Sequence, residues 1–168
     1  MKNLCLFLAL LSIGNSVFSS TEDSDKIKQS FDTYISLNTL FIDSLGGSES
    51  KGLRSRLEKY SEVELANSLY SAERIVCNDK NIEIVKSLFS LMLNTLNSAN
   101  EYPSQVLGEM FICQPDLVAT AYKALPEHER LEISRTFSFG FENAAYNNLD
   151  NEKIEKLRAR LKFLLSSK

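Results

Sequence analysis

The chain has 168 residues, of which 43% are hydrophobic and 24% charged, and its formal net charge is −3. This length suits one domain with a core of its own. The mild acidity argues against a nucleic-acid-binding protein, which needs a dense basic face to displace counterions from phosphates.

The start of the chain has the three regions of a secretory signal peptide. Lys2 supplies a positive charge, residues 4–13 are apolar, and small polar residues follow as far as Ser19. The apolar stretch is shorter than the roughly 20 residues that a membrane-spanning helix needs. We therefore expect residues 1–19 to be a cleaved signal peptide, residues 20–168 to form a single domain, and no transmembrane anchor to remain.

The location that follows from export depends on the composition of the mature chain. No Asn-x-Ser/Thr acceptor occurs despite many asparagines, which favours a bacterial envelope over a glycosylating secretory pathway. We expect the protein to be periplasmic, with an extracellular location as the alternative.

Helical spacing of apolar residues recurs along the mature chain, without the sustained alternation that strands require. Residues 27–42 predict a first helix closed by Gly46–Gly47, because glycine can adopt the left-handed conformation that ends a helix. Residues 53–60 predict a short second helix. A capping box at Ser61–Glu64 predicts that a third helix begins at Ser61 and runs to Cys77.

Residues 79–96 carry apolar side chains around most of a helical circumference, which predicts the central and most buried helix. All three prolines then precede helical stretches, where a missing N–H leaves no hydrogen bond unmade. They delimit predicted helices at 103–113, 115–125 and 126–146. A last amphipathic helix is expected from about Asp150. Its leucine face predicts burial in the core, while its basic face would alternatively suit an anionic membrane or an acidic partner.

Residues 137–141, Phe-Ser-Phe-Gly-Phe, alternate like a strand. One isolated strand has nothing to pair with, and Phe137 and Phe141 share a face at helical spacing. We predict a helix in which Gly140 permits the close approach of a neighbouring helix. The whole pattern predicts an all-α single domain of about seven to eight helices, either a bundle or a short stack of antiparallel helix pairs.

Two similar segments surround the cysteines of the mature chain. The run from Glu109 to Cys113 follows the run from Glu73 to Cys77 by 36 residues, and a fainter third copy places Tyr146 at the cysteine position. Such a period is typical of stacked helix pairs, although chance similarity between helices is the alternative. Equivalent positions on adjacent helices lie close enough for a disulfide, and export provides an oxidising compartment. We predict a Cys77–Cys113 disulfide, with two buried unpaired thiols as the alternative.

Sequence patterns for catalysis and for metal binding are weak. Ser48-Glu-Ser-Lys51 matches the S-x-x-K of serine acyl-enzymes, and Gly47–Gly52 has the glycine spacing of a phosphate loop, but both lack their companion elements. We interpret this segment as a polar turn. His128 is the only histidine and, with Glu132 one turn away, could form a general base. Two cysteines and one distant histidine lack zinc-site spacing, so we expect no metal, no cofactor and no catalytic residues.

A small exported all-helical domain with one disulfide resembles, in size and class, the periplasmic immunity proteins that neutralise cell-wall-degrading toxins. The leading hypothesis is a non-catalytic module that binds another protein in the bacterial envelope, and such immunity is one form of it. A small helical hydrolase that uses Glu73, Glu109 or His128 is the second hypothesis. The third is a carrier of apolar ligands or lipids, suggested by the phenylalanines at 137–141.

Overall fold

The structure is a computed structural model of the chain. It describes the backbone of residues 2–98, 100–148 and 151–166, and the side chains of residues 23–98, 100–146 and 151–166. The expected signal peptide, residues 1–19, lies outside the described side chains, and the expected helix start at Asp150 lies outside the described residues. The described chain is all-α without a strand, which confirms the predicted fold class.

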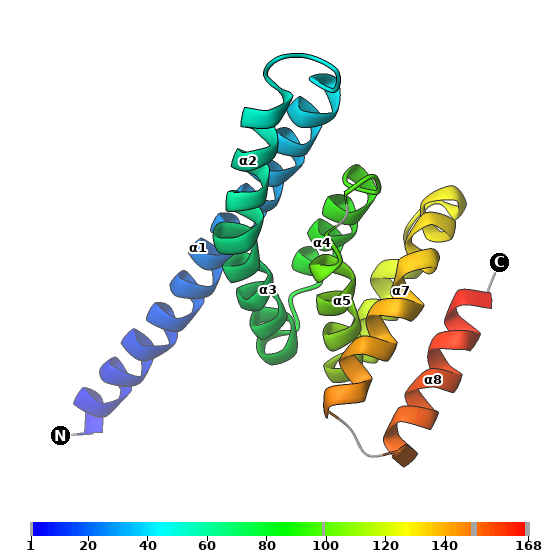
Figure 1. Cartoon of the computed structure of the whole chain (residues 1–168). Helices are drawn as coiled ribbons and strands as arrows, with labels where there is room; N and C mark the ends of the chain where they lie inside the picture. The colour runs from blue at the N-terminus through cyan, green and yellow to red at the C-terminus, as the bar shows by residue number, and fades with distance from the viewer. Residues whose placement is uncertain (1, 99, 149–150, 167–168) are drawn as a thin grey trace.

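The first unit is a hairpin of two helices (Figure 1). Helix α1 (Lys2–Asp43) buries the predicted apolar positions Ile27 and Phe31. The chain then turns, and Gly46 has a φ of 86°, a left-handed conformation that glycine adopts without a Cβ clash. Helix α2 (Ser50–Tyr60) returns along α1. The predicted closure of the first helix at the two glycines is confirmed.

The prediction that a new helix begins at Ser61 is wrong. Helix α2 continues through one π-helical turn, η1 (Ser61–Leu65), into α3 (Ala66–Asp79). Ser61 has the helical dihedral angles φ −60° and ψ −44°, whereas an N-cap residue is normally extended. Its hydroxyl accepts a hydrogen bond from Nδ2 of Asn100 at 2.8 Å. A partner distant in sequence has taken the place of the local cap.

Helix α4 (Ile82–Asn94) begins later than the sequence predicts. Helix α3 runs to Asp79, and Lys80 ends it in the left-handed conformation with a φ of 55°. Asn81 then caps α4 by accepting hydrogen bonds from the N–H groups of Glu83 at 3.0 Å and Ile84 at 3.4 Å. Burial of α4 is extensive, as predicted, but α5 buries seven residues against six in α4.

The C-terminal half follows the predicted proline boundaries closely. Helix α5 (Tyr102–Cys113) has Pro103 in its first turn, α6 (Pro115–Lys123) begins at a proline, and α7 (Glu127–Asn148) directly follows Pro126. Helix α8 (Asn151–Ser166) buries one leucine face, formed by Leu157, Leu161 and Leu164. The core interpretation of the last amphipathic helix is therefore confirmed.

Helices α5 and α7 touch through their backbones. A Cβ added to Gly140 would lie 1.8 Å from the carbonyl oxygen of Ser104, and one added to Gly108 would lie 2.4 Å from the carbonyl oxygen of Gly140. Side chains at these two positions would therefore force the helices apart. The predicted close approach at Gly140 is confirmed, and Gly108 is its counterpart on α5.

Phe137 and Phe141 lie in α7 as predicted, and both are fully buried. Their rings meet the ring of Phe111 edge-on, at centroid distances of 5.4 and 5.9 Å. This is a favoured arrangement of aromatic quadrupoles. Packing within the core thus accounts for two of the three phenylalanines that suggested a lipid carrier, whereas Phe139 is 47% exposed.

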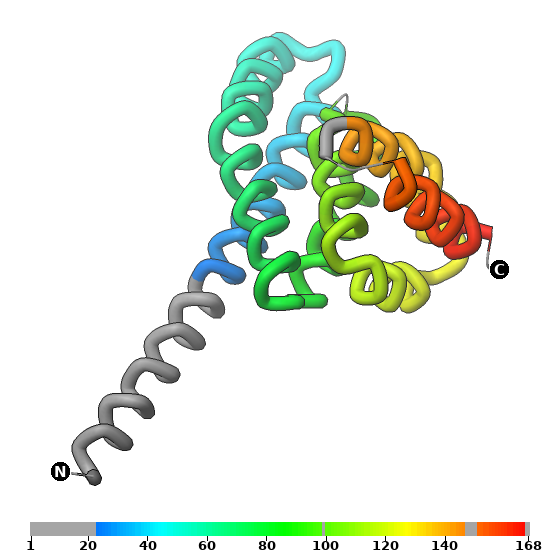
Figure 2. Tube along the Cα trace, turned by 90° about the horizontal axis from the view of Figure 1, so that it is seen from below, coloured from blue at the N-terminus to red at the C-terminus, as the bar shows by residue number. Residues whose placement is uncertain are grey.

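The helices lie in a regular succession. Helix α3 packs on α5 and α5 on α7, while α4 packs on α6 and α1 covers α3 and α4. Figure 2 shows the green helices α4 and α5 between the α1–α2 hairpin and the orange-to-red helices, while α3 continues α2. Helix α8 begins 36 residues after α6, at Asn151 and Pro115, the same offset that separates the cysteines. The arrangement agrees with stacked helix pairs.

Candidate functional site

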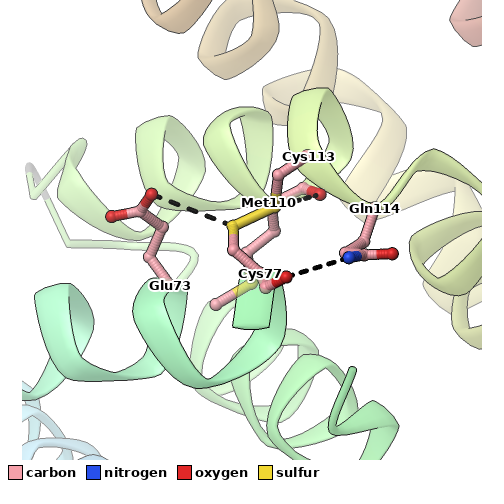
Figure 3. The surroundings of a disulfide bond; sticks show 5 residues. All are labelled: Glu73, Cys77, Met110, Cys113 and Gln114. Atoms are coloured by element: carbon pink, nitrogen blue, oxygen red, sulfur yellow. Dashed lines mark hydrogen bonds between the residues drawn. A yellow bond between two sulfur atoms is a disulfide. The ribbon is translucent and has the colours of Figure 1, made fainter. Parts of the chain in front are cut away.

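The predicted disulfide is present between Cys77 and Cys113, with an S–S distance of 2.02 Å and a Cα–Cα distance of 5.6 Å (Figure 3). The two cysteines stand near the ends of α3 and α5, which pack against each other. Nε2 of Gln114 donates a hydrogen bond to the carbonyl oxygen of Cys77 at 2.9 Å. The bond therefore joins two equivalent helix ends, and all of α4 lies in the loop that it closes.

Glu73 and Glu109, which the sequence offset aligns, lie close to each other beside the disulfide. Burial, and then the charge of Glu109, raise the pKa of Glu73. Oε1 of Glu73 lies 3.9 Å from Sγ of Cys77, drawn as a dashed line in Figure 3, but a disulfide sulfur has no proton to donate, so this is only a contact. Oε1 of Glu109 accepts a hydrogen bond from Nε2 of Gln105 at 3.1 Å.

His128 stands apart from these carboxylates, in the first turn of α7. Its side chain is 82% exposed and its Nε2 lies 4.0 Å from Oε1 of Glu129. The expected partner Glu132 instead accepts a hydrogen bond from Nη1 of Arg135 at 2.7 Å. The structure therefore does not assemble the His128–Glu132 pair. The Ser48–Lys51 segment is exposed where the turn meets α2, apart from the half-buried Ser50.

His128 does line a hollow of about 550 Å³, the His128 pocket, with Tyr122, Arg130, Leu131 and Leu165. The phenol of Tyr122 donates to the carbonyl oxygen of Arg130 at 3.1 Å, and burial raises the pKa of Tyr122. Nε of Arg130 is enclosed and unpaired within the described residues. Because protein encloses this nitrogen, a molecule in the pocket cannot reach it without a rearrangement.

The basic residues of α8 hold the helix to its neighbours. Nε and Nη2 of Arg158 donate to Glu142 of α7 at 2.7 and 2.5 Å, and this hydrogen bonding lowers the pKa of Glu142. Arg160 pairs with Asp116 of α6. Much of the basic face is thus engaged within the protein.

A second hollow lies where α1, α2, η1 and the α4–α5 connection meet. We name it the Asn38 pocket. Its volume is about 350 Å³, and the side chains that define it are those of Tyr34, Asn38, Phe41, Leu57, Ser61 and Ser98. Tyr34, Asn38 and Phe41 follow each other at helical spacing on α1, so they present one face to the hollow. Leu57 and Ser61 do the same on the continuous helix α2–η1.

Hydrogen bonds fix the α4–α5 connection on one side of this pocket. The hydroxyls of Tyr34 and Ser98 are 2.9 Å apart and hydrogen-bonded. Asn100 donates to Ser61 at 2.8 Å through Nδ2 and accepts from the N–H of Tyr102 at 3.0 Å through Oδ1. These bonds span up to 64 residues of sequence. Ser98 and Asn100 are therefore hydrogen-bonded to α1 and η1 at one wall of the pocket.

Asn38 differs from the other buried polar side chains. Ser24 accepts a hydrogen bond from Asn81 at 3.2 Å, and the hydroxyls of Thr95 and Ser104 each donate to a backbone carbonyl at 2.7 Å. Asn38 is only 4% exposed, yet within the described residues its amide has no hydrogen-bond partner. Asn38 is not among the fully enclosed unpaired side-chain atoms of the described residues, so its amide keeps contact with the pocket that it lines.

A third hollow, the Phe139 pocket, adjoins the Asn38 pocket. It has a volume of about 370 Å³ and shares Ser98 and Asn100 with it. Its apolar lining includes Met92, Leu96 and Phe139, and Leu96 and Phe139 are each 47% exposed. Ser98 and Asn100 of the α4–α5 connection therefore line both pockets, and together the two form the hollowed surface around this connection.

The sequence predicted neither the Asn38 pocket nor the Phe139 pocket. The apolar spacing of α1 predicts that Tyr34 and Asn38 share its buried face, so a polar residue on that face was the available signal. The contribution of the α4–α5 connection depends on contacts between distant residues, which local patterns do not encode.

Among the helices whose side chains are described, none is long and apolar enough to cross a bilayer. The same residues contain no group of three or more potential metal ligands. Comparison of the chain with family models, curated proteins and solved structures finds no match.

Proposed function

We propose that the protein is exported and acts as a non-catalytic module that binds another protein in the bacterial envelope. The observation that carries this proposal is the hollowed surface around the α4–α5 connection. It combines exposed apolar side chains, Leu96 and Phe139, with amides and hydroxyls fixed by hydrogen bonds. Protein interfaces typically have such an apolar centre with a satisfied polar surround. Immunity against a cell-wall-degrading toxin is one specific form of this function.

Site-specific photocrosslinking in cells tests this proposal. A photoreactive amino acid at Leu96 should give an adduct with one defined protein, because this position is exposed within the surface. The same group at Phe163, which is 71% exposed on α8, serves as the matched control. An adduct that forms equally at both positions, or at neither, would contradict the proposal.

A helical hydrolase is the second candidate, and one observation favours it. Glu73 is a carboxyl group with a raised pKa beside a second carboxylate, Glu109, and such pairs can divide the roles of acid and base. Neither residue lines the Asn38, Phe139 or His128 pocket. A Glu73→Gln variant that loses a hydrolytic activity of the purified protein while remaining folded would favour this candidate.

A further inference from the structure

The unpaired amide of Asn38 is the feature that most clearly indicates a ligand. The three other buried polar side chains of the described chain have hydrogen-bond partners, whereas the amide of Asn38 has none there and its atoms are not fully enclosed. Asn38 lines a pocket, so a molecule bound there could supply the missing partners.

We propose that the Asn38 pocket binds an extended peptide segment of the partner, with one apolar side chain against Phe41 and Leu57 and one peptide unit hydrogen-bonded to Asn38. This inference rests on the proposed function and adds its ligand chemistry. The asparagine side chain carries both a donor and an acceptor. A backbone peptide unit offers the complementary acceptor and donor, so one unit can satisfy both.

The remaining lining agrees with this occupant. Phe41 is half-buried and Leu57 is 8% exposed, so the pocket retains apolar surface for a side chain. The hydroxyls of Tyr34 and Ser98 are already paired with each other, as are Asn100 and Ser61. Asn38 is therefore the buried polar side chain of this lining that has no partner within the described residues. The volume of about 350 Å³ lies at the lower end of the range of ligand pockets, roughly 300–1,000 Å³.

The charges at the rim indicate what should flank the apolar residue. Nε of Arg54 donates to Oε1 of Glu58 at 2.8 Å, so these two charges largely cancel. Glu62 is exposed at the same rim, and no ion pair involves it within the described chain. The net negative rim favours lysine or arginine next to the apolar residue of the peptide.

The test combines peptide selection with an isosteric substitution. Random heptapeptides displayed on phage are selected on the full chain with its disulfide oxidised, and synthetic copies are titrated by fluorescence polarisation. We expect an apolar residue flanked by lysine or arginine. Asn38→Leu should weaken binding about tenfold or more, because it removes a donor and an acceptor. It should not lower the thermal midpoint, because no hydrogen bond within the described residues involves the Asn38 side chain.

Asn67→Leu is the matched control, since Asn67 is an exposed helical asparagine on α3 that does not line the pocket. It should leave both binding and thermal midpoint unchanged. A lower midpoint for Asn38→Leu with unchanged peptide binding would overturn the proposal, because Asn38 would then be structural. Binding of chitooligosaccharides but not of peptides would overturn it as well. If photocrosslinking at Leu96 captures a partner that Asn38→Leu still binds, this inference fails while the proposed function stands.

Discussion

At the scale of single residues, the contact of α5 with α7 depends on two glycines. Gly140→Ala places a methyl group where the carbonyl oxygen of Ser104 lies, at 1.8 Å from the ideal position. Backbone atoms cannot rotate away as a side chain can, so the helices must separate. We expect a loss of about 1–3 kcal/mol or more in the free energy of unfolding, measured by urea denaturation.

The matched control for this prediction is Gly52→Ala. Gly52 lies inside α2, and nothing stands within 4 Å of an added Cβ. Alanine should stabilise the protein there by about 0.5–1 kcal/mol through the lower entropy of the unfolded chain. Equal effects of the two substitutions would show that helix propensity, and not the close approach, decides the outcome.

Glu73 gives a prediction about pH. Its folded pKa is raised above the ordinary value of 4.5, so the folded protein binds more protons than the unfolded chain between these two values. Stability must therefore fall as the pH rises through this window. Glu73→Gln removes the titration, so it should raise the thermal midpoint relative to the natural protein at pH 7 and give no gain below the unfolded pKa.

Glu64→Gln is the comparison for Glu73, because Glu64 is exposed on η1. The same loss of one negative charge there should not give a gain that disappears in acid. Identical pH profiles for the two variants would contradict the role of burial and of Glu109 at Glu73.

At the scale of elements, the disulfide joins α3 to α5 and closes a loop of 36 residues. In the chain-entropy model such a loop stabilises the folded state by about 4 kcal/mol. Cys77→Ala with Cys113→Ala should lose about this amount in urea denaturation, and a reductant should have the same effect on the natural protein. A transition unchanged by reductant would show that the bond does not restrict the unfolded chain.

The sequence predicted the helices better than their boundaries. The three prolines and the leucines of α8 located the C-terminal helices because these signals act locally. The capping box at Ser61 failed because α2 continues through η1 into α3, and the serine hydroxyl instead bonds to Asn100, 39 residues away. The helix predicted to begin at Asp79 begins later, because Lys80 ends α3 in a left-handed conformation and Asn81 caps the start of α4.

The candidate site shows the same division. The disulfide was predictable because the runs that end in Cys77 and Cys113 resemble each other and each cysteine stands near the end of a helix. The Asn38 pocket was not, because α1, α2 and the α4–α5 connection are distant in sequence and their junction arises only through packing. The sequence does not distinguish Asn38 from the other asparagines, because neither its burial nor its lack of a hydrogen-bond partner is encoded in a local pattern.

At the scale of the whole molecule, the proposed export predicts both the N-terminus of the protein and the oxidation state of its cysteines. We predict that the protein isolated from the cell envelope begins at Ser20 and has both thiols oxidised. Leu8→Arg interrupts the apolar stretch of the predicted signal. This variant should remain uncleaved, with Cys77 and Cys113 reduced in the cytoplasm. Intact mass spectrometry after alkylation measures both the cleavage of the leader and the oxidation state of the two cysteines.

Leu40→Arg is the control for the leader variant, since Leu40 is 52% exposed on the mature surface. It should be cleaved and oxidised normally. An envelope protein that retains Met1 would contradict the predicted cleavage.

The bond between α3 and α5 also decides how the protein responds to tension. When the two chain ends are pulled apart, force passes from one sulfur to the other and never reaches α4. The sequence separation of 36 between the cysteines corresponds to about 120–130 Å of extended chain at about 3.3–3.6 Å per residue. In the oxidised protein this segment cannot be extended by a force on the chain ends. The residues between the cysteines therefore stay folded under loads that unfold the terminal helices.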